Sequence, residues 1–455
     1  MKTKAKTKAR TAAAFRRRQR GSVSIFVAVS LIALLGILGL AVDSGFGYMI
    51  KARLDAATDG AVIAAGEAVT RGNNQTEQTN NAQQAATAFF AANYPAGFLG
   101  SSVTAGTPSI VFNAGTVTIG MTAQASVPVT FSKVLGFNVL NVSSSSQAIR
   151  KTLDMVFVVD NTQSLNTFGV PAAVRSNAVA FLNNFDVTND RVALMHFAYG
   201  TVVDVPFKGN TRGFDRATMT TDINNYTFSG STNSPEALWN ARNQLNTVIT
   251  QPSSLRVIVF FSDGAPNSFS SFFTTNQSKC NNISTTLASG DSQTGSPSGL
   301  FSINALSQKL ASPCYQNDTS GFVTAMPKWY NAHNVNEQTF PIWPVTSPRV
   351  VSNGNATYVN VNRASRNLLE AMAAAARAEG TYVFTLGYGN ELTKPAGPDN
   401  ELGQDVLKCM ANTADSLSRC YNPKQPVGVY CYAATPADLK PCFSQLASQI
   451  LRISK

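Results

Sequence analysis

The sequence has no cysteine before Cys280 and only two histidines, His196 and His333, among its 455 residues. No C-x-x-C pair occurs either, so the ligands of a structural zinc site are too few and too scattered. The G-x-S-x-G, H-E-x-x-H and phosphate-loop patterns are absent as well. Neither histidine has a credible nucleophile partner, so the sequence predicts a protein that is not an enzyme.

Acidic residues are absent before Asp43, so most of the net positive charge of the chain comes from this N-terminal stretch. Without the basic residues of this stretch, 27 basic and 25 acidic residues remain, a net charge of +2 against +11 for the whole chain. A nearly neutral body argues against nucleic-acid binding, which requires basic residues over a folded face. The stretch before Asp43 contains nine basic residues: Lys2, Lys4, Lys6, Lys8, Arg10, Arg16, Arg17, Arg18 and Arg20.

A run of 20 uncharged residues, Val23 to Val42, follows the basic arm of residues 1–21. As a helix it would span about 30 Å, the thickness of the hydrocarbon core of a bilayer. The basic flank predicts a single-pass helix over residues 22–43, with the N-terminus cytoplasmic and the rest of the chain outside the membrane. A cleaved signal peptide is the alternative, but its apolar region is normally about 7–15 residues.

Gly21 and Ser22 at the membrane edge are similar to a prepilin processing site. In such sites the fifth residue after the glycine is normally glutamate, whereas this chain has Phe26. We therefore expect the anchor to be retained and not cut.

Two small regions are expected after the span. Residues 44–95 are predicted to be helical, with a polar connector at Arg71–Gln84 and a short helix that stops before Pro95. Residues 96–150 alternate apolar and polar side chains and are rich in Val, Thr and Ile, which predicts a small antiparallel sheet. The sequence Asn-Ala-Gly at 113–115 separates two such runs and indicates a hairpin.

Strand and helix patterns alternate from residue 152 to 455, which predicts an α/β, Rossmann-like domain with a mostly parallel sheet and helices on both faces. Residues 267–360 lack this alternation and are predicted to be an inserted surface element. The strand candidates are residues 153–160, 191–200, 201–207, 255–264 and 381–389. The helix candidates are residues 171–185, 233–249, 363–380 and 436–453.

All six cysteines lie C-terminal to Gly264, and an even number beyond the membrane predicts disulfides. Six cysteines allow 15 pairings. Proximity in the sequence suggests that the first two pair and that the last four pair among themselves. They are Cys280, Cys314, Cys409, Cys420, Cys431 and Cys442.

Three stretches rich in oxygen ligands are expected at the carboxyl edge of the predicted sheet, where such folds bind ligands. They contain two carboxylates and three hydroxyls, a donor set that favours Mg²⁺, with Ca²⁺ or Mn²⁺ as further candidates, over zinc or copper. Asp, Ser and Thr are also common in turns and helix caps, so a purely structural turn is the alternative. The candidate ligands are Asp160, Thr162, Ser164, Thr232 and Asp263.

The order and spacing of D-x-T-x-S, a later threonine and S-D-G resemble the metal-ion-dependent adhesion site of von Willebrand factor A (vWA) domains. The resemblance implies that Asp160 and Ser164 bind the metal directly, that Thr232 binds in one conformation and that Asp263 often binds through water. Thr162 stands where the family usually has serine. An acidic side chain of a protein partner would complete the metal shell, because neutral hydroxyls leave positive charge on the ion.

The N-terminal stretch "RRRQRGSVSIFVAVSLIALLGILGLAVDSGFGYMIKARLDAATDGAVIAA" resembles the anchoring segment of Tad/Flp pilus-assembly proteins of the TadG type. That family combines such a segment with a C-terminal vWA domain. The resemblance implies a pilus-assembly or adhesion protein that binds pilus or envelope components. It also implies that the anchor lies in a bacterial inner membrane, with the C-terminal domain periplasmic or extracellular. Two alternatives remain: an adhesin unrelated to pili that binds envelope or host matrix, and a hydrolase whose site carries no recognised pattern.

Overall fold

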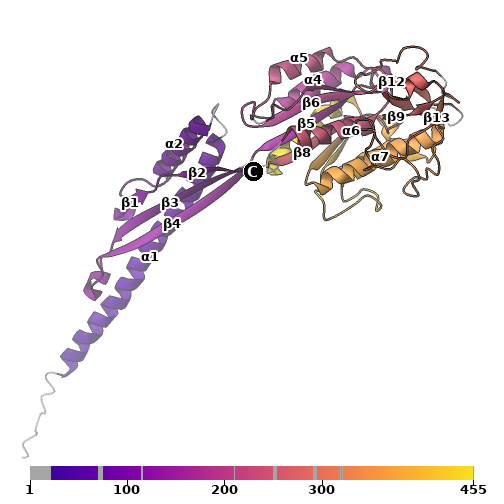
Figure 1. Cartoon of the computed structure of the whole chain (residues 1–455). Coiled ribbons are helices and arrows are strands. Elements are labelled where there is room, and N and C mark those ends of the chain that lie inside the picture. The colour runs from indigo at the N-terminus through magenta and orange to yellow at the C-terminus, as the bar shows by residue number, and fades with distance from the viewer. Residues whose placement is uncertain are drawn as a thin grey trace, which may run out of the picture. The chain divides into compact units, whose positions relative to one another are not determined.

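A computed structural model describes residues 22–69, 75–113, 116–209, 211–249, 254–290, 295–317, 319 and 321–453. The basic arm predicted for residues 1–21 lies outside this part of the chain. The described residues form two compact units (Figure 1). Of the described residues, the first unit draws on the ranges 22–65, 82–109 and 120–147, and the second on those within 66–81, 110–119 and 148–453.

Helix α1 (Ser22–Ala68) begins the first unit and runs without a break from the apolar run into the polar sequence beyond it. No proline interrupts it, and alanine and leucine recur, which favours one long helix. It is the single helix of the described chain that is long and apolar enough to cross a membrane. Most of its apolar side chains before Val42 are exposed, whereas Ile50 and Leu54 are fully buried.

Helix α2 (Gln75–Asn93) shows that the connector predicted at Arg71–Gln84 is wrong from Gln75 onward. Ala82, Ala86 and Phe90 recur every four residues and are buried, so packing of this stripe outweighs the weak helix propensity of the threonines and asparagines at the start of the helix. The helix ends two residues before Pro95, as the sequence predicts.

A four-stranded sheet completes the small region, and β3 is its central strand, with β1, β2 and β4 paired to it. Alternate residues of β3, including Met121, Ala123, Ala125 and Val127, are buried, as expected for a sheet with one covered face. β1 runs antiparallel to β3, and residues 114–115 of the predicted hairpin turn lie outside the described residues. The strands are β1 (Ser102–Ala105), β2 (Ser109–Asn113), β3 (Thr116–Pro128) and β4 (Val139–Lys151).

The second unit is built on a six-stranded sheet in the order β17-β14-β8-β5-β6-β7. Its strands are parallel except β7, because the three residues between β6 and β7 are too few for a crossover connection. The predicted mostly parallel α/β fold is therefore confirmed. The strands are β5 (Leu153–Asp160), β6 (Arg191–Phe197), β7 (Thr201–Val205), β8 (Leu255–Ser262), β14 (Tyr382–Tyr388) and β17 (Tyr430–Ala433).

Helices cover both faces of this sheet (Figure 1). Met155 and Phe157 of β5 pack toward α4, α5 and α9, whereas Val156 and Val158 pack toward α6, α7 and α8. This alternation is the period-two pattern of a strand buried on both sides. The helices are α4 (Pro171–Leu182), α5 (Arg216–Asn225), α6 (Ser234–Asn243), α7 (Tyr358–Ala378), α8 (Gly403–Ala411) and α9 (Pro436–Ile453).

The segment predicted as an inserted surface element at 267–360 is instead built into the core. Phe269, Leu287, Leu300 and Tyr330 are almost fully buried against α6 and α7. The serine- and threonine-rich composition predicted a surface element, but several of these hydroxyls are buried and hydrogen-bonded inside the segment, as Ser270 is to Thr286 at 2.8 Å. Its strands are β9 (Ser268–Phe272), β10 (Thr274–Thr275), β11 (Ser284–Ala288), β12 (Ser298–Ser302) and β13 (Val323–Ala325).

Short elements and three disulfides complete the second unit. Cys280 is joined to Cys314 within the inserted segment. The other pairs, Cys409–Cys420 and Cys431–Cys442, also join cysteines that are neighbours in the sequence. The remaining short elements are α3 (Gln163–Thr167), β15 (Pro395–Ala396) and β16 (Glu401–Leu402).

Candidate functional site

The candidate site begins where β5 ends, at the fully buried Asp160. Its Oδ1 accepts a hydrogen bond of 2.8 Å from the backbone N–H of Thr162. Its Oδ2 accepts one of 2.6 Å from the hydroxyl of Ser262, the last residue of the neighbouring strand β8. These two bonds fix the orientation of the carboxylate at the carboxyl edge of the sheet.

Thr162 is the residue just before α3 and Ser164 lies in the first turn of that helix, and both hydroxyls face Asp263. The Ser164 hydroxyl is 2.9 Å from Asp263 Oδ1, and the Thr162 hydroxyl is 3.3 Å from the same oxygen. The two hydroxyls are 3.0 Å apart. Side chains that are about a hundred residues apart in sequence therefore meet in one cluster.

Thr232 reaches the cluster on a loop that is held in place by Asn267. The Thr232 N–H donates to Asn267 Oδ1 at 3.0 Å, and the Asn267 N–H donates to the Thr232 carbonyl at 3.1 Å. A Cβ placed on Gly264 would lie 3.5 Å from the Thr232 hydroxyl, so this hydroxyl borders the loop of Asp263. The backbone pairing thus fixes the loop that carries the third hydroxyl.

Two buried carboxylates in one cluster are electrostatically costly. Burial raises the pKa of Asp160 to about 6, although the Ser262 and Thr162 hydrogen bonds act in the opposite direction. Burial, and then the negative charge of Asp160, raise the pKa of Asp263 well above its ordinary range. Both carboxylates therefore favour a compensating positive charge, supplied either by a proton or by a cation.

The residues present fit a hard divalent cation. Asp263 Oδ2 is buried and has no hydrogen-bond partner among the described residues. In the same part of the chain, no cluster of three or more His, Cys, Asp or Glu side chains could hold a metal, so a site here depends on hydroxyl ligands. Two carboxylates and three hydroxyls form an all-oxygen set that suits Mg²⁺ better than softer metals.

The inserted segment forms part of the rim of this edge. Backbone N–H groups of Tyr199, Gly200 and Thr201, in the turn between β6 and β7, donate to carbonyls of residues 303–306. A Cβ on Gly230, two residues before Thr232, would lie 2.7 Å from the carbonyl oxygen of Leu306. The surface next to the site is therefore built partly from the inserted segment.

Four of the five residues that the sequence predicts as ligands share one hydrogen-bonded cluster, Asp160, Thr162, Ser164 and Asp263, and the Thr232 hydroxyl lies beside the neighbouring Gly264. Sequence reasoning missed Ser262 and Asn267, which orient Asp160 and Thr232 without belonging to the predicted ligand set. Both lie within the stretch "FFSDGAPN", so closeness to Asp263 in the sequence was the only indication that they belong to the site. His196 bonds Asp204 at 2.8 Å and His333 bonds Glu236 at 2.7 Å, so each histidine is paired with a carboxylate outside the site.

Two family models match separate parts of the chain. Residues 154–297 match the von Willebrand factor type A domain, and residues 21–70 match a family described as putative Flp pilus-assembly TadE/G-like. The chain thus carries a TadE/G-like segment followed by a vWA domain, the organisation that the sequence predicts. No curated protein matches the chain.

Several solved structures are similar at low sequence identity. The vWF domain of the type V pili tip protein Mfa5 from Porphyromonas gingivalis is 15% identical with a TM-score of 0.39, over 68% of this chain and 98% of that one. The pilus adhesin SpaC from Lactobacillus rhamnosus GG is 13% identical with a TM-score of 0.38, over 78% and 35%. Proximal thread matrix protein 1 from the mussel byssus, with a zinc-occupied MIDAS motif, is 12% identical with a TM-score of 0.33, over 66% and 46%.

Proposed function

Since the chain joins a TadE/G-like segment to a vWA domain, we propose that it is a membrane-anchored protein of pilus assembly or adhesion. In this proposal α1 anchors it in the inner membrane with the N-terminus cytoplasmic. The vWA domain binds a protein partner, a pilus or envelope component, outside the cytoplasm. The apolar run of α1, with basic residues before it and Asp43 after it, supports this topology.

We further propose that a divalent cation, Mg²⁺ in the first place, binds at Asp160, Thr162, Ser164, Thr232 and Asp263. The observation that carries this proposal is the unpaired, buried Oδ2 of Asp263 beside the second buried carboxylate. A cation there supplies positive charge that a carboxylate of a partner can share. The protein residues hold the cluster rigid through Ser262 and Asn267 and leave the hydroxyls of Thr162 and Ser164 at the edge of the sheet.

Partner capture from envelope extracts tests the proposal. We expect the full-length protein to retain a partner in Mg²⁺ and to lose it in EDTA, and the Asp160→Ala variant to lose it in both. Equal recovery of the same partner by wild type, by the variant and in EDTA would refute the metal-dependent function. A partner from outside the pilus machinery would favour the alternative of an adhesin unrelated to pili.

Thr162 permits a sharper test of the hydroxyl ligands. Thr162→Ser keeps the oxygen and removes a methyl group, so we expect Mg²⁺ affinity close to that of wild type. Thr162→Val keeps the shape and removes the oxygen, so we expect at least about 10-fold weaker binding. Isothermal titration with Mg²⁺ measures both, and equal affinities for the serine and valine variants would exclude Thr162 from the metal shell.

A further inference from the structure

The connection between β3 and β4, together with the first two residues of β4 (residues 129–140), packs against α1 inside its apolar run. We call this segment the β3–β4 tip. A Cβ on Gly39 would collide with the Cβ of Phe131, so the tip touches the helix there. Gly39 lies three residues before Val42, the end of the apolar run, which corresponds to about 4.5 Å along the helix axis. The tip thus extends back past the level at which the apolar run of α1 ends.

Asp43 fixes the tip at this level. Its Oδ1 accepts a 3.1 Å hydrogen bond from the Thr130 N–H, and its Oδ2 accepts bonds of 3.1 and 2.7 Å from the N–H groups of Phe131 and Ser132. Asp43 is only 7% exposed, so three backbone donors replace the water that its carboxylate would otherwise require. The tip therefore supplies the hydrogen bonds that the carboxylate of Asp43, directly after the apolar run, requires.

The contact face of α1 is formed by residues four apart. Gly39, Asp43 and Gly47 lie on one face of the helix, because every fourth residue of a helix projects in nearly the same direction. A Cβ on Gly47 would collide with a methyl group of Leu140, so glycine at both positions lets the tip approach closely. The tip thus contacts α1 near its start, at residues 130–132, and at its end, at Leu140, so its level along α1 is set.

The outer side of the tip is apolar although nothing in the described chain covers it. Phe131, Phe137 and Val139 are 47%, 60% and 50% exposed. Lys133, between the two phenylalanines, is also exposed. Aromatic side chains with a neighbouring lysine are typical of segments that lie at the boundary between lipid headgroups and acyl chains.

We propose that the β3–β4 tip is a second membrane contact, which inserts Phe131 and Phe137 into the lipid interface beside α1 while Lys133 reaches the lipid phosphates. This inference rests on the proposed membrane span of α1. The lipid surface is the occupant that the structure favours, because Asp43 and Gly39 tie the exposed face to the level of the bilayer edge. With two points of contact, the first unit would be unable to rotate freely about the axis of α1.

Depth-dependent fluorescence quenching in vesicles tests this contact with the full-length protein. Phe137→Trp is reconstituted into phosphatidylethanolamine–phosphatidylglycerol vesicles, with or without bromine on the acyl chains near the headgroups. The three native tryptophans, Trp239, Trp329 and Trp343, lie in the second unit, so the wild-type signal is subtracted. Val29→Trp, inside the apolar run, reports the anchor itself.

Phe89→Trp is the matched control. Phe89 is 41% exposed, and its ring lies against Gly60, 21 residues beyond Gly39 and so about 30 Å further along α1. We expect the added emission of Phe137→Trp and Val29→Trp to be largely lost in brominated vesicles and that of Phe89→Trp to be retained.

Each other outcome overturns a different statement. Quenching at Val29 without quenching at Phe137 would refute the tip contact and leave the anchor intact. No quenching at Val29 would refute the anchor and the tip contact together. If Phe137→Trp is shielded from aqueous acrylamide but unaffected by brominated lipid, a protein surface such as a second copy covers the tip, and the lipid contact is wrong.

Discussion

Asp263→Asn is expected to stabilise the metal-free protein at pH 7 and to destabilise it relative to wild type when Mg²⁺ is in excess. The substitution removes one of two neighbouring buried negative charges, which relieves repulsion when no cation is bound. It also removes a negative charge from the metal shell. Mutating a residue that only hydrogen-bonds to a metal ligand lowers metal affinity about 10–100-fold, so we expect loss of a charged ligand to lower Mg²⁺ affinity at least about 100-fold. Thermal unfolding followed by tryptophan fluorescence measures both effects, because all three tryptophans lie in the second unit.

The pH dependence gives an internal check on this expectation. The pKa of Asp160 is raised to about 6, so between the ordinary pKa of aspartate and that value the folded protein binds more protons than the unfolded chain. Metal-free wild type should therefore gain stability as the pH falls from 7 toward 5, and the advantage of Asp263→Asn should shrink.

Asp190→Asn is the matched control for Asp263→Asn. Burial raises the pKa of Asp190 as well, but this residue lies just before β6, at the opposite edge of the sheet. We expect its Mg²⁺ response to equal that of wild type. If Mg²⁺ raises the unfolding temperature of wild type, Asp190→Asn and Asp263→Asn by the same amount, the proposed metal site is wrong.

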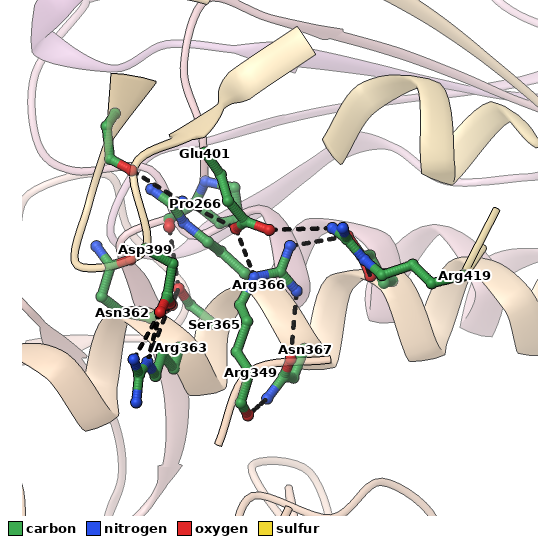
Figure 2. Close-up of polar contacts among 12 residues, drawn as sticks. Pro266, Arg349, Asn362, Arg363, Ser365, Arg366, Asn367, Asp399, Glu401 and Arg419 are labelled. Atoms are coloured by element: carbon green, nitrogen blue, oxygen red, sulfur yellow. Dashed lines mark hydrogen bonds and ion pairs between the residues drawn. The ribbon is translucent and has the colours of Figure 1, made fainter. Parts of the chain in front are cut away.

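Arg349→Met is expected to lower the free energy of unfolding of the second unit by about 3–5 kcal/mol. Arg349 is 3% exposed and lies in a network of arginines and glutamates beside α7 (Figure 2). It is 2.9 Å from Glu370 and 2.6 Å from Glu401, and it also donates to Asn367 at 3.2 Å. Removing the central cation leaves two partly buried carboxylates that depend more heavily on the remaining arginines, Arg366 and Arg419.

Lys394→Met provides the comparison for this network. Lys394 pairs with Glu391 at 2.7 Å, but both side chains are at least half exposed. An exposed pair of this kind contributes up to about 1 kcal/mol. Denaturant unfolding followed by tryptophan fluorescence should separate the two variants clearly. Similar midpoints for Arg349→Met and Lys394→Met would mean that the buried network adds no more than a surface ion pair.

Most of the candidate site could be predicted from the sequence because its residues follow apolar strands. Met155–Val159 of β5 and Val257–Phe261 of β8 are apolar runs that lead to Asp160 and to Ser262–Asp263, and parallel neighbours end at the same edge. The supporting contact of Asn267 could not be predicted. It depends on how a loop folds back onto Thr232, and an asparagine after a proline has no periodic pattern.

The elements that sequence reasoning missed share a physical cause. Helix α8 is short, and the cysteine-rich sequence around it masks the apolar stripe of Val406, Leu407 and Met410. The inserted segment buries its aromatics by pairing hydroxyl-rich strands with one another, so its composition is typical of a surface loop. In both cases the structure depends on tertiary packing, and the local helix or strand propensity of the residues does not predict it.

Strand β5 connects the anchored N-terminal part of the chain to the proposed metal site. Only Thr152 separates β4 of the small sheet from β5, and β5 ends at Asp160. If a partner held at the metal is pulled away from the anchored chain, the tension enters β5 at Leu153 and leaves it at Asp160. Because both points lie on β5, the covalent backbone of that strand carries the load, and its hydrogen bonds to β6 and β8 keep it in place, so the site can bear force without a strand being peeled from the sheet.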